Sequence, residues 1–261
     1  MTRPIVFLSD YGLTDEFVGV CHGVIARIAS DARVIDLAHA VPRQDILRGA
    51  LMLGRATAYM PSDAVYLAVV DPGVGSERRS IAVRAMSGGL LVGPDNGVLS
   101  IGWDALGGVD AAAEITAHSV LMHPVSLTFH GRDIFAPAAA HLAIGMALEQ
   151  LGPALDPLGL HTLELPTPMV AVGAVGTRVV GVDRFGNVQL NAQPADLDAA
   201  ALGDVLTVAG RQIPRVGTFG DVPEGQLALI VDSQGQVSLI VNGGSAAEVL
   251  GLRDGSAVVL E

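Results

Sequence analysis

Hydrophobic and polar positions follow two rhythms along the first 150 residues. Short continuous apolar runs predict β-strands at 4–9, 33–38, 64–70 and 80–86. Apolar residues that recur with a helical period predict helices at 15–30, 43–60 and 132–151. Strands that alternate with helices are typical of an α/β domain in which helices cover a mainly parallel sheet. We therefore expect an α/β domain over residues 1–155.

The pattern changes after residue 155. Three prolines lie between residues 156 and 170, and we predict a linker over 156–170. Beyond it, short apolar runs recur about every ten residues, which is typical of an antiparallel barrel or sandwich. These runs are 177–183, 187–192, 204–210, 226–232, 236–242 and 256–261, and the spacing at 245–252 predicts one short helix. We expect an all-β domain, a small barrel, over residues 171–261.

Composition narrows the function classes. The 261 residues are 50% hydrophobic and 16% charged, and no apolar run reaches the roughly 18 residues of a spanning helix. The N-terminus lacks the features of a signal peptide, so we expect a cytoplasmic protein that does not bind membranes. All 15 basic residues are arginine, which excludes a Schiff-base or phosphate-loop lysine. The net charge of −12 argues against nucleic-acid binding. The single cysteine, Cys21, excludes an internal disulfide.

Polar residues end five of the apolar runs. They are Asp10, His39, Asp71, the pair Asp95–Asn96, and His130. Because ligands of open α/β sheets bind beyond the carboxyl ends of the strands, parallel strands would bring these side chains to one edge. A Pro-Gly turn after Asp71 leads back to Arg78 and Arg79, so we expect one of them to face Asp71 across a pocket. Each feature also has a structural explanation, since Asp-Pro-Gly is common turn chemistry and Asp10 could cap the next segment.

Several familiar site motifs are missing from the chain. The sequence contains no phosphate-binding loop with lysine, no H-E-x-x-H zinc motif and no G-x-S-x-G nucleophile elbow. The stretch GVGSER has the first two glycines of a dinucleotide-binding turn, but Arg78 takes the place of the third. Nicotinamide, ATP-loop and zinc-protease functions are therefore unsupported.

Six motifs in order resemble one enzyme family. They are FLSDYGLTDEFVG, VVDPGVGSERRSIAV, GPDNGVLS, TFHGRDIFAPAAAHLA, VDRFGNVQLN and NGGSAAEVLGL, which together span nearly the whole chain. The chain resembles the S-adenosyl-L-methionine (SAM) hydrolases (adenosine-forming), also called SAM hydroxide adenosyltransferases, which are related to the fluorinases and chlorinases. The resemblance implies an N-terminal α/β domain, a C-terminal β-barrel and a homotrimer. The pocket would then lie between one subunit's N-terminal domain and its neighbour's C-terminal domain.

The resemblance also implies roles for particular residues. The catalytic positions of the family fall on Asp71, Arg78 and His130, and Asp10 matches the carboxylate that holds the ribose hydroxyls. Asp183 and Ser233 fall near the positions that receive the methionine part. The segments around the adenine contain Phe185, Asn187, Phe219, Asn242 and Gly243. Taken alone, DRFGN and NGGS would each be explained as a turn.

The implied reaction is attack of water on the 5′-carbon of SAM, which gives adenosine and L-methionine. The sulfonium is already a good leaving group, so we expect no metal and no cofactor. Asp71 would orient the water, an adjacent Arg78 would favour the ionised form of Asp71, and His130 would either relay the proton or hold the water. Two alternatives remain: a non-catalytic sensor that binds SAM or adenosine, and a SAM-dependent halogenase. The short SGG turn at 87–89 leaves no room for the extra loop that the resemblance associates with fluorinases.

Overall fold

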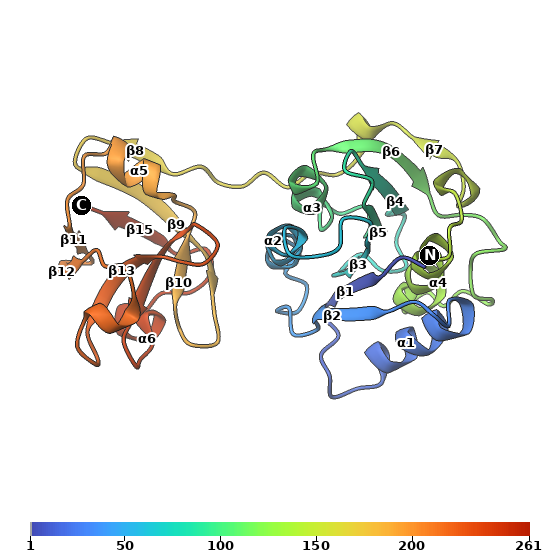
Figure 1. Cartoon of the computed structure of the whole chain (residues 1–261), viewed down its shortest axis with the longest axis horizontal. Coiled ribbons are helices and arrows are strands. Elements are labelled where there is room, and N and C mark those ends of the chain that lie inside the picture. Colours follow the sequence, from blue (N-terminus) through green and yellow to red (C-terminus); the bar gives the residue numbers. More distant parts are fainter. Residues whose placement is uncertain (1) are drawn as a thin grey trace. The chain divides into compact units, whose positions relative to one another are not determined.

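The computed structural model describes residues 2–261, which divide into two compact units between Leu163 and Glu164. The predicted linker, 156–170, spans this division (Figure 1). Its first part belongs to the first unit, because a 3₁₀ turn, η3 (Pro157–Gly159), is followed by Leu160, which is buried in that unit's core. Its last residues begin β8 (Met169–Ala171) of the second unit. We describe each unit by itself.

The first unit is a seven-stranded sheet between helices, as predicted for an α/β domain. The strand order is β2-β1-β3-β5-β4-β6-β7. The strands are β1 (Ile5–Ser9), β2 (Val34–Ala38), β3 (Val65–Val69), β4 (Ser80–Ala85), β5 (Leu90–Pro94), β6 (Val109–Glu114) and β7 (Ala154–Leu155). The helices are α1 (Phe17–Ile28), α2 (Ile46–Thr57), α3 (Ser100–Ala105) and α4 (Ala136–Ala143), with a π-helical turn η1 (Gly131–Phe135) and a 3₁₀ turn η2 (Leu148–Gln150).

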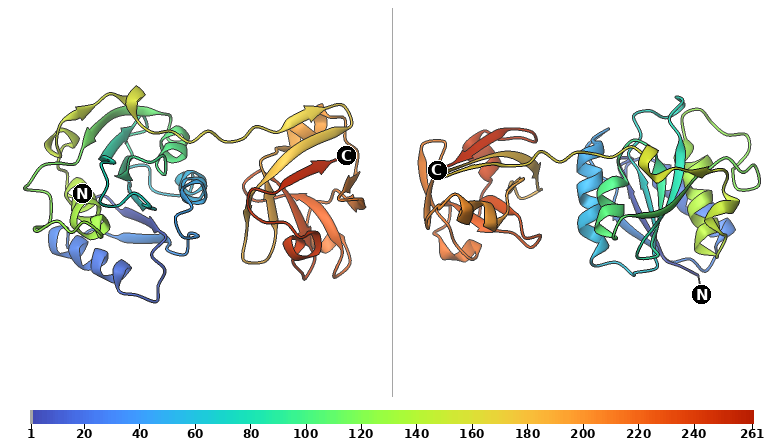
Figure 2. Two further views of the ribbon diagram at one scale, coloured as in Figure 1. Left: turned by 180° about the vertical axis from the view of Figure 1, so that it is seen from behind. Right: turned by 90° about the horizontal axis from the view of Figure 1, so that it is seen from above.

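The central strands are buried on both faces, which explains their continuous apolar sequences. In β1, Ile5 and Phe7 pack into the core under α1 and α4, whereas Val6 and Leu8 pack into the core under α2. Helices therefore cover both faces of the sheet (Figure 2). A strand that is covered on both faces shows no alternation of apolar and polar residues, because every side chain enters a core.

The sheet is mixed, and the direction of β4 matters most for the site. β2, β1, β3 and β5 pair in parallel, while β4 pairs antiparallel with both β5 and β6. β4 therefore starts at the edge where β1, β3 and β5 end. The residues just before β4, Arg78 and Arg79, thus lie at the same edge as Asp71, which directly follows β3.

Two local predictions for the first unit are wrong. The apolar run 126–130, which ends at His130 and is one of the five possible parallel strands, is not a strand. The side chain and carbonyl of Asp133 accept the backbone N–H groups of Ser126 and Met122 and fold 122–133 into a loop. The helix predicted over 132–151 is shorter. It consists of η1 and α4 and ends near Gly145, whose φ of +98° takes the chain out of the helix.

The second unit is antiparallel, as predicted for an all-β domain. Its main sheet has the order β13-β14-β10-β9-β15, with β8 on β9 and a separate hairpin β11-β12. The strands are β9 (Ala174–Val182), β10 (Val188–Leu190), β11 (Val205–Val208), β12 (Arg211–Pro214), β13 (Leu227–Val231), β14 (Val237–Val241) and β15 (Ala257–Leu260). The helices are α5 (Pro194–Ala199), the 3₁₀ turn η4 (Phe219–Asp221) and the predicted short helix α6 (Ala246–Leu250).

The hairpin of the second unit contacts both edges of the main sheet. Backbone hydrogen bonds join Thr207 of β11 to Glu261 beyond β15, and Arg215 beyond β12 forms a bridge with Leu229 of β13. Full closure into a barrel remains a prediction. Across residues 2–261, no helix is long and apolar enough to cross a membrane.

Candidate active site

Asp71 and Arg78 form the centre of a polar cluster at the carboxyl edge of the first sheet. The Nε of Arg78 donates to Asp71 Oδ1 at 2.9 Å and to Oδ2 at 3.1 Å, and Nη2 also donates to Oδ2. The two side chains are only 6% and 10% exposed, so water screens this charge-assisted pair weakly. The expected contact between Asp71 and an arginine is present, and Arg78 is the partner.

His130 joins this pair through the same guanidinium. Arg78 Nη2 lies 2.7 Å from Nδ1 of His130. Because a guanidinium only donates hydrogen bonds, Nδ1 is the acceptor and the ring proton lies on Nε2. Burial, and then the positive charge of Arg78, lower the pKa of His130 from its ordinary value of 6.5. The imidazole is therefore neutral at pH 7.

Arg78 directs its remaining N–H groups at the protein as well. Nη1 donates to Ser80 Oγ at 2.8 Å and lies 3.5 Å from the carbonyl oxygen of Arg79. The guanidinium carbon is 5.1 Å from the centroid of the Phe135 ring, within the range of a cation–π contact. The guanidinium has five N–H groups, and its hydrogen bonds hold neighbouring groups of the protein in place.

Gly75 allows the 71–79 connection to approach the segment that carries His130. Its φ is +78°, a conformation that residues with a side chain rarely adopt. A Cβ at this position would lie 2.4 Å from the carbonyl oxygen of Leu127. The second glycine of GVGSER therefore allows the backbones of two loops to approach each other closely.

Asp10 and Tyr11 follow β1 at the same edge. Asp10 Oδ2 accepts the backbone N–H of Gln44 at 2.9 Å, which leaves Oδ1 for another donor. A Cβ on Gly131 would lie 2.0 Å from the Tyr11 hydroxyl, so this ring packs directly against the start of η1. Burial, and then neighbouring acidic groups that include Asp71 and Asp10, raise the pKa of Tyr11 well above its ordinary value.

The second arginine of the pair, Arg79, has a structural partner. Its Nε donates to Asp95 Oδ2 at 2.8 Å and its Nη2 to the carbonyl of Gly159 at 2.6 Å. Asp95 Oδ1 also accepts the N–H of His161 at 2.9 Å. The next residue, Asn96, donates its side-chain amide to the backbone at the end of β3 at 2.8 Å. Arg79 and Asp95 therefore anchor the segment after β7, a role that the sequence left open.

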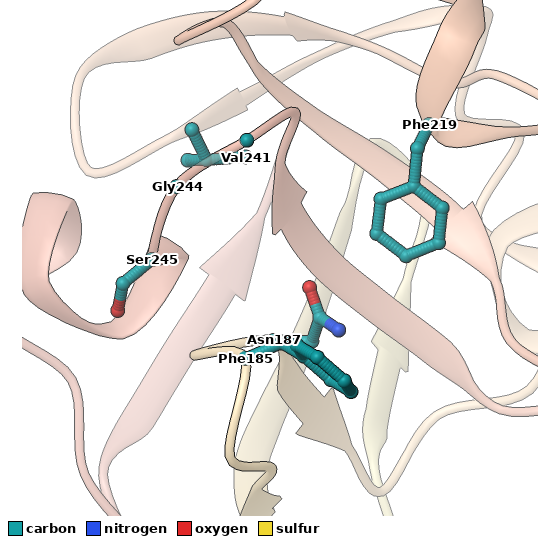
Figure 3. A pocket seen from close by; sticks show the side chains of 7 residues that line it. Phe185, Asn187, Phe219, Val241, Gly244 and Ser245 are labelled. Carbon is teal, nitrogen blue, oxygen red and sulfur yellow. The ribbon is translucent and has the colours of Figure 1, made fainter.

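The second unit has a separate pocket of about 510 Å³ that four of the predicted binding residues line. They are Phe185, Asn187, Phe219 and Gly243, and Val241, Gly244 and Ser245 complete the lining. Figure 3 shows the ring of Phe219 and the amide of Asn187 facing the same space. Phe185 is 73% exposed although its side chain is large and apolar. An exposed aromatic ring at a pocket is typical of a surface that stacks on a flat ligand.

The other predicted binding residues of this unit lie around the pocket or away from it. Asp183 accepts hydrogen bonds from the backbone N–H groups of Phe185 and Asn187 at 2.8 and 2.9 Å, so it shapes the turn that carries them. Asn242, next to the lining residues, donates to the carbonyl of Val222 at 2.8 Å. Ser233 lies in the turn before β14, whereas the pocket follows β14, so the structure does not group Ser233 with the pocket.

The comparisons of this chain with known proteins agree with one another. The model described as SAM hydroxide adenosyltransferase N-terminal domain matches residues 5–152, and the model of the corresponding C-terminal domain matches 177–259. A protein of Salinispora tropica named (R)-S-adenosyl-L-methionine hydrolase is 53% identical over 97% of this chain and 96% of its own length. A fluorinase of an Actinoplanes species is 27% identical over 99% of this chain and 97% of its own. The solved structure of a conserved protein from Thermotoga maritima is 36% identical, with a TM-score of 0.90 over 98% of this chain and 99% of that one.

Proposed function

Because this chain belongs to the SAM hydroxide adenosyltransferase family, we propose that it is an enzyme that hydrolyses SAM to adenosine and L-methionine. The water oxygen forms a bond to the 5′-carbon of the ribose. The bond from that carbon to sulfur breaks, and its electron pair stays on the sulfur, which becomes the thioether of methionine. One proton is released. The observation that carries this proposal is the buried cluster in which Arg78 holds both Asp71 and His130.

In this mechanism Asp71 is the group that orients the water. Arg78 donates to Oδ1 once, so that oxygen retains a lone pair for a hydrogen bond from the nucleophile. A fixed acceptor places the water oxygen in line with the breaking bond. Its negative charge also stabilises the positive charge that develops on the water as the O–C bond forms. Positioned groups of this kind contribute about 10²–10⁴-fold to the rate.

His130 acts as a donor in this proposal. Arg78 occupies Nδ1, so the neutral ring presents Nε2–H to the reaction site. A nitrogen that already carries a proton is not a base, which favours a role in holding the water or the product hydroxyl over a role as proton relay. Because Arg78 donates its N–H groups to other groups of the protein, it is a positioning residue.

We propose that the complete site needs the polar cluster of the first unit and the pocket of the second unit, and that more than one subunit contributes to it. The first unit offers Asp10 for the ribose hydroxyls and the Asp71 cluster for the reaction. The second offers Phe185 and Phe219 for stacking on adenine and Asn187 for pairing with its edge. In a homotrimer the first unit of one subunit would meet the second unit of its neighbour. Asp183, Asn242 and Gly243 would then border the methionine and adenine parts, whereas Ser233, at the other end of β14, has no place in this proposal.

A halogenase function fits the first unit less well. A halide-binding site needs donors that are not already engaged, whereas Arg78 directs its donors at Asp71, His130 and the backbone near β4. A carboxylate also repels a halide, because two like charges 4 Å apart cost about 4 kcal/mol at an effective dielectric of about 20. Water, which needs an acceptor, is the nucleophile that this site suits.

The proposed function is tested by incubating the purified protein with SAM and following adenosine by chromatography. We expect adenosine and methionine in equal amounts. In heavy-oxygen water the label should enter the adenosine 5′-hydroxyl, and excess chloride or fluoride should give no 5′-halo product. The two sulfonium epimers are assayed separately, since the relative from Salinispora tropica is named for the (R) form. Tight adenosine binding without turnover would instead identify a sensor.

A further inference from the structure

The loop that follows β1, residues 9–12, is held by a histidine outside the proposed reaction site. The Oγ of Ser9 lies 2.8 Å from Nδ1 of His39, and both residues are buried. The backbone N–H of Tyr11 donates to the same Oγ at 3.4 Å. The backbone N–H of Gly12 donates to the carbonyl of His39 at 2.6 Å. His39 therefore contacts the loop with both its side chain and its backbone, on either side of Asp10.

The other ring nitrogen of His39 fixes the direction of these hydrogen bonds. Nε2 lies 3.0 Å from Asp36 Oδ1, and a carboxylate accepts, so Nε2 carries the ring proton. Nδ1 then accepts the hydroxyl proton of Ser9, which leaves the Ser9 oxygen to accept from Tyr11. Asp36 Oδ1 also accepts from Nε2 of His22 at 2.8 Å. Within the chain from His22 through Asp36 and His39 to Ser9, each hydrogen bond thus joins a donor to an acceptor.

A β-bulge makes this arrangement possible. Phe7 of β1 pairs with Asp36 of β2, but Leu8 pairs with Ala38, so one extra residue lies in β2. Residues three apart on a regular strand point to opposite faces. The extra residue turns His39 back toward the side of Asp36, and the His39 ring packs edge-on against Phe7 with centroids 4.6 Å apart. Bulges beside functional sites commonly redirect a side chain in this way.

We propose that His39, oriented by Asp36, is a positioning residue that holds the 9–12 loop so that Asp10 faces the ribose of the substrate. This inference rests on the proposed function only for the role of Asp10. Ser9 is not a nucleophile, because it is 0% exposed and both its proton and its oxygen are engaged. The network acts on substrate binding and leaves the Asp71 cluster unchanged.

The test is Ser9→Ala in the full-length protein, with Thr57→Val as the matched control. Thr57 is equally a buried hydroxyl, bonded to the carbonyl of Gly54 at 2.8 Å in α2. We expect Ser9→Ala to raise KM for SAM and Kd for adenosine by roughly 5- to 30-fold, because it leaves His39 Nδ1 and the Tyr11 N–H without their partner. The kcat should stay within about threefold. Thr57→Val should change neither constant.

Hydrogen exchange separates this inference from the proposed function. Ser9→Ala should speed exchange of the Tyr11 and Gly12 amides at least about tenfold, whether or not the protein hydrolyses SAM. If Ser9→Ala does not fold, Asp36→Asn carries the same test, since its side chain is 46% exposed. Unchanged KM, Kd and exchange would overturn the inference. So would a fall in kcat with KM unchanged, because the network would then act on the reaction itself.

Discussion

Asp71→Asn tests the proposed chemistry most directly. The amide keeps the shape of the carboxylate but loses its charge, and its nitrogen cannot accept a hydrogen bond from Arg78 or from water. We expect kcat to fall at least about 10²-fold, which corresponds to about 2.7 kcal/mol and lies within the range for hydrogen bonds to charged groups. The Kd for adenosine should change only a few-fold, since Asp71 is assigned to the water and not to the nucleoside.

The same change should also lower stability, because it leaves the Arg78 cation without its counterion where the side chain is only 10% exposed. A loss of about 1–3 kcal/mol would lower the Tm of the first unit by roughly 2–12 °C. The double variant Asp71→Asn with Arg78→Met removes the unpaired charge. It should recover part of the stability and none of the activity, which would separate folding from catalysis.

A matched control lies on the same sheet edge. Asp95 is 1% exposed at its side chain and pairs with Arg79, so Asp95→Asn removes a comparable buried charge. It should cost less stability than Asp71→Asn, because the Arg79 side chain is 33% exposed and water can solvate its charge, and it should leave kcat within about threefold. An equal fall in kcat for both variants would mean that any damage to this edge abolishes turnover. Equal losses of adenosine binding and turnover in Asp71→Asn would mean that Asp71 mainly holds the ligand. Either result refutes the assignment of Asp71 to the water.

Other predictions concern the remaining parts of the site. Because burial lowers the pKa of both His130 and His141 in the folded state, the native protein binds fewer protons than the unfolded chain, so stability should fall as the pH drops below about 6.5, and His130→Asn should reduce this acid-side loss in denaturant titrations. Asp133→Asn should lower kcat more than it raises KM in initial-rate assays, because Asp133 accepts from the backbone of Ser126 and shapes the loop before His130. Phe185→Ala should weaken adenosine binding about 5- to 150-fold by calorimetry, since stacking on a base contributes about 1–3 kcal/mol. Dialysis against EDTA should leave kcat unchanged, because the sulfonium leaves without help from a metal.

Much of the fold follows from sequence pattern, because it depends on burial. Strands β1 to β4 of the first sheet are predicted because strands covered on both faces need continuous apolar residues, whereas β6 and β7 are missed. Most antiparallel strands of the second unit follow from short runs between turns. The segment 126–130 misleads the same reasoning. Its apolar residues resemble a strand, yet the Asp133 carboxylate, seven residues after Ser126, takes the backbone hydrogen bond that a strand partner would need. The pattern of apolar residues does not reveal a side chain that competes for the backbone hydrogen bonds of a strand.

The candidate site is predictable only in part, for a related reason. The sequence predicts that Arg78 or Arg79 faces Asp71, because turn residues connect them, and the structure identifies Arg78 as the partner. The roles of Arg79 and Asp95 could not, because their partners, Gly159 and His161, lie more than 60 residues away. Nothing in the sequence indicated the role of Asp36, since one polar residue in a short strand is common. A β-bulge that redirects His39 toward it leaves no mark in the sequence.

The direction of one strand explains why the reaction cluster forms where it does. If β4 ran parallel to β5, the chain after Asp71 would have to cross to the opposite edge of the sheet, and Arg78 would begin β4 far from β3. The antiparallel β4 lets a short loop return to the edge it left, and this loop brings a buried carboxylate and a guanidinium into contact. The same reversal places Arg79 beside Asp95 at the end of β5. Adjacent arginines on one loop thus serve separate tasks: Arg78 organises the reaction cluster, and Arg79 ties down the chain that leads to the second unit.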